Sequence, residues 1–311
     1  MTSDQALLEH ALLGLEAGGA IEYTGEFGAE IATFVPFALW LKREGRLAGR
    51  RVITYRGMRP YYYFLGDDEF EEKAGPRAWL PVEDRGWPSR STYSATRQAW
   101  HAMPDYRSRY AGQGMEFDRS VLFIQNKFTV EWGRGPINYL PLDPLARLFE
   151  LTAERFDIVY SRPRSLGTDV GYSSDHNSHC DYPDLEIARR FKHVRILEDL
   201  CAATGDDYNQ TKLEILAKSH LFVAAQGGGA HLLACFGDSL LLLLHLQGEE
   251  YPHAYAAGPY KYLAANPPIL LLARDHDQFV LGVELMGAVQ VEGKGLKIGA
   301  GWRAIHDELR I

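Results

Sequence analysis

One segment, residues 221–245, constrains the fold more than any other stretch of this chain. Its sequence, LFVAAQGGGAHLLACFGDSLLLLLH, holds two apolar runs separated by three consecutive glycines and a short helical pattern. The apolar runs, 221–226 and 239–246, do not alternate with polar residues, which is typical of strands buried on both faces of a parallel sheet. Parallel strands need a crossover connection, and the helical pattern at 229–237 supplies one. The segment therefore predicts a strand–turn–helix–strand unit of an α/β domain.

The same alternation of strand and helix runs through the second half of the chain. Further strands are predicted at 120–129, 157–163 and 193–200, and helices at 143–156, 182–191, 210–220 and 273–287. Because strands and helices alternate, we expect a doubly wound α/β domain over residues 119–311. The last of these helices is expected to pack back on the first domain.

The first part of the chain predicts a smaller unit of the same class. A helix is predicted at 4–16, then a strand at 21–23, a glycine turn, a helix at 29–44 with a kink or early break at Pro36, and a strand at 50–57. Residues 65–118 mix Pro, Gly, Ser and charged side chains, which indicates long loops and a domain boundary near 118. The expected architecture is α/β, with two Rossmann-like doubly wound domains, 1–118 and 119–311, that face a common cleft.

Charge and composition exclude several classes of protein. The 311 residues carry a formal net charge of −8 and no long basic run, which argues against nucleic-acid binding. Three cysteines without a close-spaced pair are typical of a reducing compartment, and the first residues lack the basic region of a signal peptide. The leucine run 240–244 is far shorter than the roughly 20 apolar residues that span a bilayer. A cytoplasmic location is therefore expected.

The glycine triplet Gly227, Gly228 and Gly229 predicts an anion site. The three glycines lie between a strand and a helix, where backbone N–H groups point outward and no side chain blocks the approach of a phosphate. His231, two residues later, can donate to a phosphate or to a sugar hydroxyl. The alternative is a tight turn chosen for packing, with His231 as a structural hydrogen-bonding residue. The segment is neither GxGxxG nor a P-loop, so neither a standard dinucleotide site nor an ATPase follows.

Cations and carboxylates follow other strands of the second domain. Lys127 and Arg162 come directly after two predicted strands, and cations there would neutralise a diphosphate leaving group without a metal. Glu250 follows the leucine strand and is a candidate for binding ribose or sugar hydroxyls. The alternative is that these residues are ordinary surface charges. The loop 174–184 is rich in Asp, His and Cys, but no second ligand pair exists elsewhere, so no metal site is expected.

The glycine turn of the first domain, TGEFGAE, predicts a second part of the site. Gly25 and Gly28 let this loop pass close to a ligand, and Glu26 and Glu30 are its carboxylates. A carboxylate at a cleft can act as a general base. The alternative is that both residues stabilise the start of the following helix through its dipole. Of the two, Glu26 is preferred as the base because it lies at the tip of the turn.

Taken together, these motifs resemble bacterial glycosyltransferases of the GT-B type, particularly those of lipopolysaccharide, capsule and O-antigen gene clusters. The stretch GEFGAEIATFVPFALWL resembles their N-terminal glycine loop and first helix, and NKFTVEW with the later FDIVYSRP resembles the start of their donor domain. YNQTKLEILAKSHLFVAAQGGGAHLLACFG, with the GEE that follows, resembles their donor-phosphate segment. The order and spacing of these motifs carry the resemblance, which covers most of the chain except 65–118.

The resemblance implies an acceptor-side domain at 1–118 and a nucleotide-sugar donor domain at 119–311. It implies transfer of a hexosyl or deoxyhexosyl group from a nucleotide diphosphate sugar to a glycan or glycolipid, with no cofactor and no metal. Contact with a membrane would be peripheral and through the acceptor only. The family's usual His-x7-Glu donor signature is not evident in these segments, so the resemblance leaves the donor base unidentified. Two other functions stay open: a non-catalytic nucleotide- or sugar-binding protein, and another nucleotide-sugar enzyme such as an epimerase.

Overall fold

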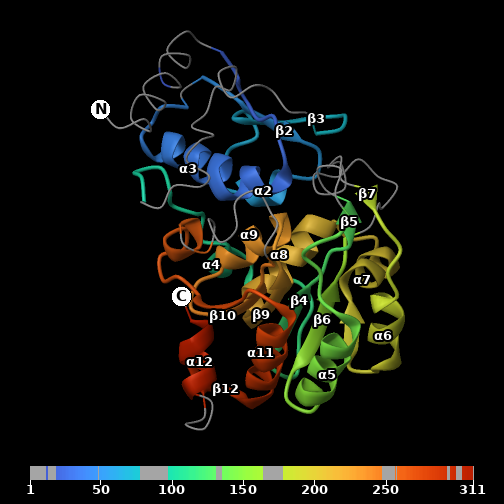
Figure 1. Cartoon of the computed structure of the whole chain (residues 1–311). Helices are drawn as coiled ribbons and strands as arrows, with labels where there is room; N and C mark the ends of the chain where they lie inside the picture. The colour runs from blue at the N-terminus through green and yellow to red at the C-terminus, as the bar shows by residue number, and fades with distance from the viewer. Residues whose placement is uncertain are drawn as a thin grey trace.

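The computed structural model describes residue 12 and residues 19–47, 49–77, 97–130, 135–163, 178–246, 256, 258–292, 295–298 and 303–310. Within these residues the chain forms two separate parallel sheets, each flanked by helices (Figure 1). The expected α/β class, with buried parallel strands, is therefore confirmed. None of the described helices is both long and apolar enough to cross a membrane.

The first sheet has three short strands in the order β1-β2-β3, all parallel. They are β1 (Ile21–Glu22), β2 (Val52–Tyr55) and β3 (Phe70–Lys73). Between the first two, a continuous helical segment is formed by α2 (Phe27–Ala29), the π-helical turn η1 (Glu30–Phe34) and α3 (Val35–Arg43). The helix does not break at Pro36, which lies just after the π-helical turn η1, so the irregularity expected at this proline is in the five residues before α3. The described part of this sheet is not doubly wound, unlike the expectation.

The second sheet has six parallel strands in the order β11-β10-β9-β4-β6-β8. Their bounds are β4 (Val121–Gln125), β6 (Asp157–Ser161), β8 (Val194–Ile196), β9 (Ser219–Ala225), β10 (Leu240–Leu244) and β11 (Ile269–Ala273). The chain starts at β4, builds outward to β8, then returns to the other side of β4 with β9. The strand order thus reverses between β4 and β9, as in a doubly wound sheet.

Helices cover both faces of this sheet (Figure 1). One face packs against α5 (Leu142–Thr152), α6 (Asp184–Arg190), α11 (His276–Ala288) and α12 (Arg303–Leu309). The other packs against α7 (Leu197–Thr204), α8 (Tyr208–Lys218) and α9 (Gly228–Ala234). The strand predicted at 193–200 ends at Ile196, because Glu198 and Asp199 lie in the first turn of α7, where acidic groups favour a helix start.

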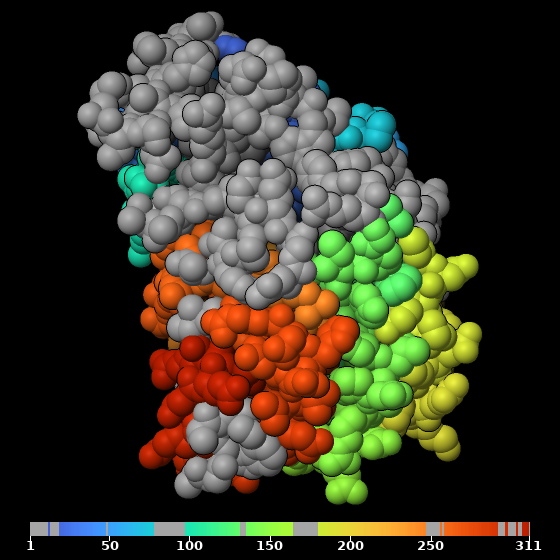
Figure 2. Space-filling model, viewed as in Figure 1, coloured from blue at the N-terminus to red at the C-terminus, as the bar shows by residue number. Residues whose placement is uncertain are grey.

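Two small antiparallel pairs complete the fold. The strand β5 (Thr129–Val130) pairs with β7 (Ser178–His179), and β12 (Val289–Glu292) pairs with β13 (Gly295–Ile298). The sequence did not predict β11 or α12. The expected return of the last predicted helix to the first domain is wrong. It forms α11, which packs on α5, and α12 packs on α11 and β11. In the space-filling view the orange segment that carries α11 meets the green segment that carries α5 (Figure 2).

The two sheets share one apolar core. Side chains of the first sheet and its helices belong to the same buried cluster as one face of the second sheet, including Phe27, Phe34, Phe123, Phe222 and Leu243. The connecting residues strengthen this junction: α4 (Tyr106–Tyr110) packs on α8, and the turn η2 (Arg59–Tyr62) lies beside it. The first unit is therefore fixed on the α8 and α9 side of the second.

Hydrogen bonds cross the same junction. The Tyr61 hydroxyl donates to Oδ1 of Asn209 at 3.0 Å, and Nδ2 of Asn209 donates to the carbonyl of Gly57 at 2.7 Å. From α4, Nη1 of Arg107 donates to the carbonyl of Ala217 at 2.8 Å. These bonds satisfy polar groups that the apolar contact would otherwise bury without partners.

The closest approach between the units joins two glycine turns. A Cβ atom at Gly28 would lie 2.6 Å from Cδ2 of His231 and 3.0 Å from Cα of Gly228, and a Cβ atom at Gly228 would lie 3.1 Å from the backbone N of Gly28. Only glycine fits at both positions without a shift of the backbone. The start of α2 therefore lies directly on the start of α9.

Replacing Gly28 by alanine should destabilise the protein by about 1–3 kcal/mol, because the added methyl group overpacks this contact. The free energy of unfolding, measured by urea denaturation, checks this. Gly112→Ala is the matched control, since a Cβ atom there would meet nothing within 4 Å. Equal stability of the two variants would contradict the packing argument.

Candidate functional site

The candidate site lies where the strand order of the second sheet reverses. In a doubly wound sheet, neighbouring connections leave this point in opposite directions and open a crevice at the carboxyl ends of the strands. The carboxyl end of β4 continues into Gln125, Asn126 and Lys127, and that of β9 continues into Gln226 and Gly227. Residues that the sequence placed after two separate strands are thus neighbours in space.

Lys127 and Gly227 meet at this point. Gly227 has φ 155° and ψ −174°, a conformation that is essentially restricted to glycine. A Cβ atom on Gly227 would lie 3.1 Å from Nζ of Lys127, so the ammonium group lies against bare backbone. Lys127 is partly exposed. A cation beside an unobstructed turn is an arrangement that suits an anion.

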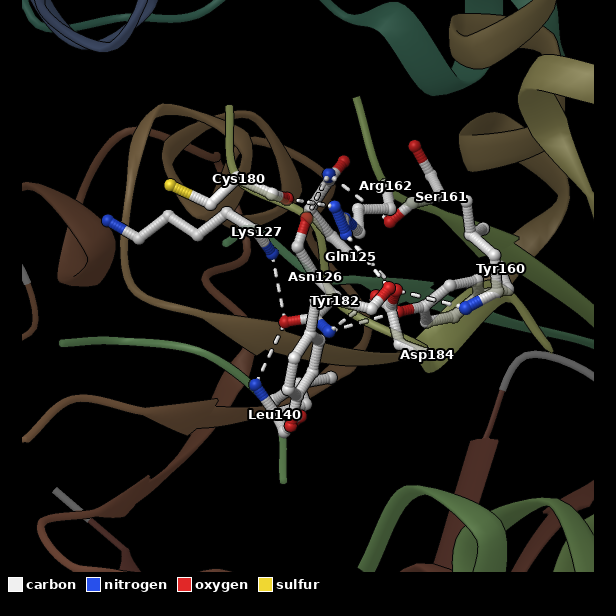
Figure 3. A network of polar contacts seen from close by, with 11 residues as sticks. Gln125, Asn126, Lys127, Leu140, Tyr160, Ser161, Arg162, Cys180, Tyr182 and Asp184 are labelled. Atoms are coloured by element: carbon white, nitrogen blue, oxygen red, sulfur yellow. Dashed lines mark hydrogen bonds and ion pairs between the residues drawn. The ribbon is translucent and has the colours of Figure 1, made fainter. Parts of the chain in front are cut away.

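Asn126 fixes the backbone that carries Lys127 (Figure 3). Its Oδ1 accepts hydrogen bonds from the backbone N of Lys127 at 2.9 Å and from that of Leu140 at 2.8 Å. Its Nδ2 donates to the Tyr160 hydroxyl at 2.9 Å and to Oδ2 of Asp184 at 3.0 Å. Every hydrogen-bonding position of this fully buried amide is used. Sequence reasoning missed Asn126, although its position beside Lys127 at the end of a buried strand was a usable signal.

Arg162 joins this network through Asp184. It is 5% exposed, its Nη1 lies 3.2 Å from Oδ1 of Asp184, and its Nη2 donates to the carbonyl of Cys180 at 2.6 Å. The Tyr160 hydroxyl also donates to Asp184. Burial raises the pKa of Asp184, while the bonds from Tyr160 and Arg162 act in the opposite direction. The structure thus places Arg162 in a buried ion pair, whereas the sequence predicted that it binds the diphosphate of the donor.

Burial also sets the protonation of Tyr160. Its pKa lies well above the ordinary value, because the side chain is buried and next to the Asp184 carboxylate. The hydroxyl therefore keeps its proton and remains a donor. In Figure 3 the Lys127 ammonium extends away from this network, so the network holds the backbone and leaves the charged end of Lys127 outside it.

Packing accounts for the other members of the glycine turn. Gly228 touches α2, and a Cβ atom on Gly229 would lie 2.7 Å from Cγ of Gln125. His231 is 4% exposed, and its Nδ1 lies 2.5 Å from the Tyr260 hydroxyl of η5 (Pro259–Lys261). The packing alternative that the sequence left open therefore explains Gly228, Gly229 and the position of His231. A side chain at Gly228 would collide with the protein itself before it met a ligand.

The two carboxylates of the first glycine turn lie in different environments. Glu30 is fully buried, its Oε2 lies 2.7 Å from Nη1 of Arg77, and it accepts hydrogen bonds from Tyr62 at 2.8 Å and from Thr54. This set of partners is that of a structural ion pair. Glu26 immediately precedes α2 and is partly exposed. Of the two predicted bases, Glu26 alone keeps contact with the surface.

Arg77 joins the first turn to its sheet. Besides Glu30, its Nη1 reaches the carbonyl of Gly25 at 3.1 Å, and its guanidinium carbon lies 4.4 Å from the ring centroid of Tyr55. Gly25 has φ 135°, and a Cβ atom there would lie 2.8 Å from the Tyr23 hydroxyl. The turn is therefore held internally. Sequence reasoning missed Arg77 because it lies in the mixed stretch 65–118, which carries no periodic pattern.

Two sequence predictions fall outside the described residues. These are Glu250 and the first part of the loop 174–184, residues 174–177. Among the residues that the structure describes, no three His, Cys, Asp or Glu side chains gather in a way that could hold a metal ion.

Comparisons with known proteins give only distant similarity. No protein-family model matches the chain, and no curated protein matches it significantly. A crystal structure of a glycosyl transferase family 9 protein from Veillonella parvula DSM 2008 aligns with a TM-score of 0.49 and 10% identity over 88% of this chain and 90% of that one. The E. coli ADP-heptose LPS heptosyltransferase II aligns with a TM-score of 0.35 and 14% identity over 81% of this chain and 60% of that one. Similarity this distant identifies neither a family nor an activity for this chain.

Removing Arg162 should destabilise the fold strongly, because Asp184 would keep a buried charge without its cation. Arg162→Leu is expected to lower the free energy of unfolding by about 3–5 kcal/mol. The exposed pair between Arg189 and Asp199 supplies the control, and Arg189→Leu should cost at most about 1 kcal/mol. Chemical denaturation of both variants measures the difference, and similar losses would show that the Arg162 pair is not structural.

Proposed function

We propose that this protein is a glycosyltransferase of the GT-B type that moves a hexosyl or deoxyhexosyl group from a nucleotide diphosphate sugar to a hydroxyl of a glycan or glycolipid. The observation that carries the proposal is the Lys127 ammonium against the Gly227 backbone at the reversal point between β4 and β9. A diphosphate is the leaving group of such a donor, and it needs a cation in a site where the backbone allows close approach.

The proposed chemistry assigns leaving-group stabilisation to Lys127. As the bond between the anomeric carbon and the diphosphate oxygen breaks, negative charge grows on that oxygen. An ammonium group beside this oxygen stabilises the charge, and the backbone that carries it is already fixed by the fold. Asn126 contributes indirectly, because its two bonds to backbone N–H groups fix the loop from which Lys127 extends. The proposal needs no metal ion and no cofactor.

The proposed general base is Glu26. It immediately precedes α2, and Gly28, two residues later, touches Gly228 beside the proposed diphosphate turn. Glu26 thus comes from the first unit, whose helix α2 meets the donor unit at Gly228, and its carboxylate is proposed to reach an acceptor hydroxyl there. Glu30 is assigned to its buried pair with Arg77 instead. A base on the acceptor side corresponds to inversion of the anomeric configuration.

A panel of nucleotide diphosphate sugars tests the activity. The protein is incubated with UDP-, GDP- and ADP-linked sugars, and release of free nucleoside diphosphate is followed with and without glycan and glycolipid acceptors. Slow release, accelerated by an acceptor, supports a transferase. Tight binding without turnover would favour a binding protein, and conversion of the sugar without release of nucleotide would favour an epimerase.

Lys127→Ala should weaken binding of the nucleoside diphosphate by about 1.5–3 kcal/mol, the size of a hydrogen bond to a charged group. Isothermal titration calorimetry measures the change, and Lys127→Arg should retain most of the affinity because it keeps the charge. Lys192→Ala is the control, since this exposed lysine precedes β8 at the opposite edge of the sheet. Unchanged affinity in Lys127→Ala would remove Lys127 from the site.

Glu26→Gln should lower turnover on the order of a hundredfold or more, because it removes the basicity at nearly constant size. Affinity for the donor should change little. Glu44→Gln, on an exposed position of the same unit, is the matched control and should leave turnover unchanged. Normal turnover in Glu26→Gln would overturn the assignment of the base.

A further inference from the structure

A fully buried lysine lies behind the proposed diphosphate turn. Lys212 belongs to α8, has no exposed surface, and donates from Nζ to Oε1 of Gln125 at 2.7 Å. Lysines are almost never fully buried unless their charge has partners. Burial lowers the pKa of Lys212 to about 8, although the Glu198 carboxylate acts in the opposite direction.

Gln125 connects this ammonium group to the turn. A Cβ atom on Gly229 would lie 2.7 Å from Cγ and 3.1 Å from Oε1 of Gln125, so the amide presses against the first turn of α9. Its Nε2 donates to the carbonyl of Asn126 at 3.2 Å, directly before Lys127. One hydrogen-bonded amide therefore separates the Lys212 charge from the backbone on which the diphosphate is proposed to bind.

Glu198 is the carboxylate whose charge opposes that of Lys212. Oε1 of Glu198 accepts hydrogen bonds from Ser161 at 2.9 Å and from Tyr208 at 3.2 Å. Its Oε2 is buried and has no hydrogen-bond partner among the described residues. Burial raises the pKa of Glu198. Burial therefore disfavours the charged forms of both Lys212 and Glu198. A further anion close to Lys212 would favour its charged form.

We propose that Lys212 is a positioning residue of the diphosphate site and that its neutral amine takes up a proton to become the ammonium form when the diphosphate binds. This inference rests on the proposed function. Negative charge placed on the turn favours the charged form of a buried amine nearby, and the attraction is strong because little water screens it. Since unliganded Lys212 loses its proton from pH 8 upward, binding in that range restores it. Affinity should therefore fall as pH rises above 8.

Other groups around Lys212 do not give the same signature. Glu198 of α7 and Tyr208 of α8 itself act on Lys212 directly. The elements packed on α8 carry further titratable or charged groups, which are Cys201 of α7, Tyr61 of η2, and Tyr106 and Arg107 of α4. Burial raises the pKa of Cys201 to about 11 and that of Tyr106 well above its ordinary value. Uptake of a proton near pH 8.5 that disappears with Lys212 is thus specific to this residue.

Calorimetry of UDP and GDP binding at pH 7.5 and 8.5, in buffers with different heats of ionisation, tests the proposal. Both nucleotides have fully ionised phosphates at pH 8.5, so a dependence of the binding heat on the buffer reports protonation of the protein. The wild-type protein should take up a fraction of a proton at pH 8.5. Binding without proton uptake would overturn the role of Lys212 and leave the proposed function intact. If neither nucleotide bound at pH 7.5, ADP would be measured in the same way, and failure of all three to bind would contradict both proposals.

Variants show which residue takes up the proton. Lys212→Met, which keeps the length of the side chain, should bind roughly tenfold more weakly at pH 7.5 and should show no uptake at pH 8.5. Lys218→Met is the matched control from the same helix, where the lysine pairs with Glu116, and it should behave like the wild type. Uptake that persists in Lys212→Met would overturn the proposal, whatever happens to affinity.

A wild-type measurement covers the case in which Lys212→Met fails to fold, as judged by circular dichroism. In protein with ¹³C-labelled lysine ε-carbons, one NMR signal should titrate near pH 8, and its midpoint should rise when UDP or GDP is added. If every lysine signal titrated near pH 10 to 11, or if the midpoint near 8 did not move with nucleotide, the proposal would be wrong.

Discussion

The contact between Gly28 and Gly228 sets the distance between the two units, and the candidate site depends on that distance. Because neither residue carries a side chain, α2 reaches the backbone of α9, and Glu26, which immediately precedes α2, is brought toward this junction. The same contact orients His231, whose ring lies between α2 and Tyr260. A single added methyl group would move all three features at once.

The reversal of strand order explains why charged groups gather at one point of a largely apolar sheet. Strands buried on both faces offer no room for polar side chains along their length, so these side chains collect where the strands end. Around β4 the buried groups form closed networks: Asn126 joins Tyr160 and Asp184, and Gln125 joins Lys212. Such satisfied networks hold backbone atoms in fixed places. Precise placement of Lys127 is then a property of the fold rather than of its own flexible side chain.

The sequence allowed the parallel sheet and the position of the glycine turn to be predicted, because continuous apolar runs and strand-to-helix glycines are local signals. It also indicated that Lys127 and Gly227 lie at strand ends. The helix α7 was missed because it directly follows β8, a strand of only three residues, and the two were predicted as one strand. The five-residue strand β11, which lies next to a helix, was missed as well. Partners such as Asp184 for Arg162, or Arg77 for Glu30, are separated by tens of residues. Only the tertiary structure decides these pairs, so the sequence could not show that two predicted site residues are buried in ion pairs.

The shared apolar core has a consequence for the way this chain folds. The described strands of the first unit have only two to four residues, which is short for a strand, and its phenylalanine side chains are buried together with those of the second sheet. The larger sheet therefore acts as the template on which the first unit becomes ordered. Folding of the first unit is therefore contingent on the second, so denaturation of the second sheet should unfold the first unit as well.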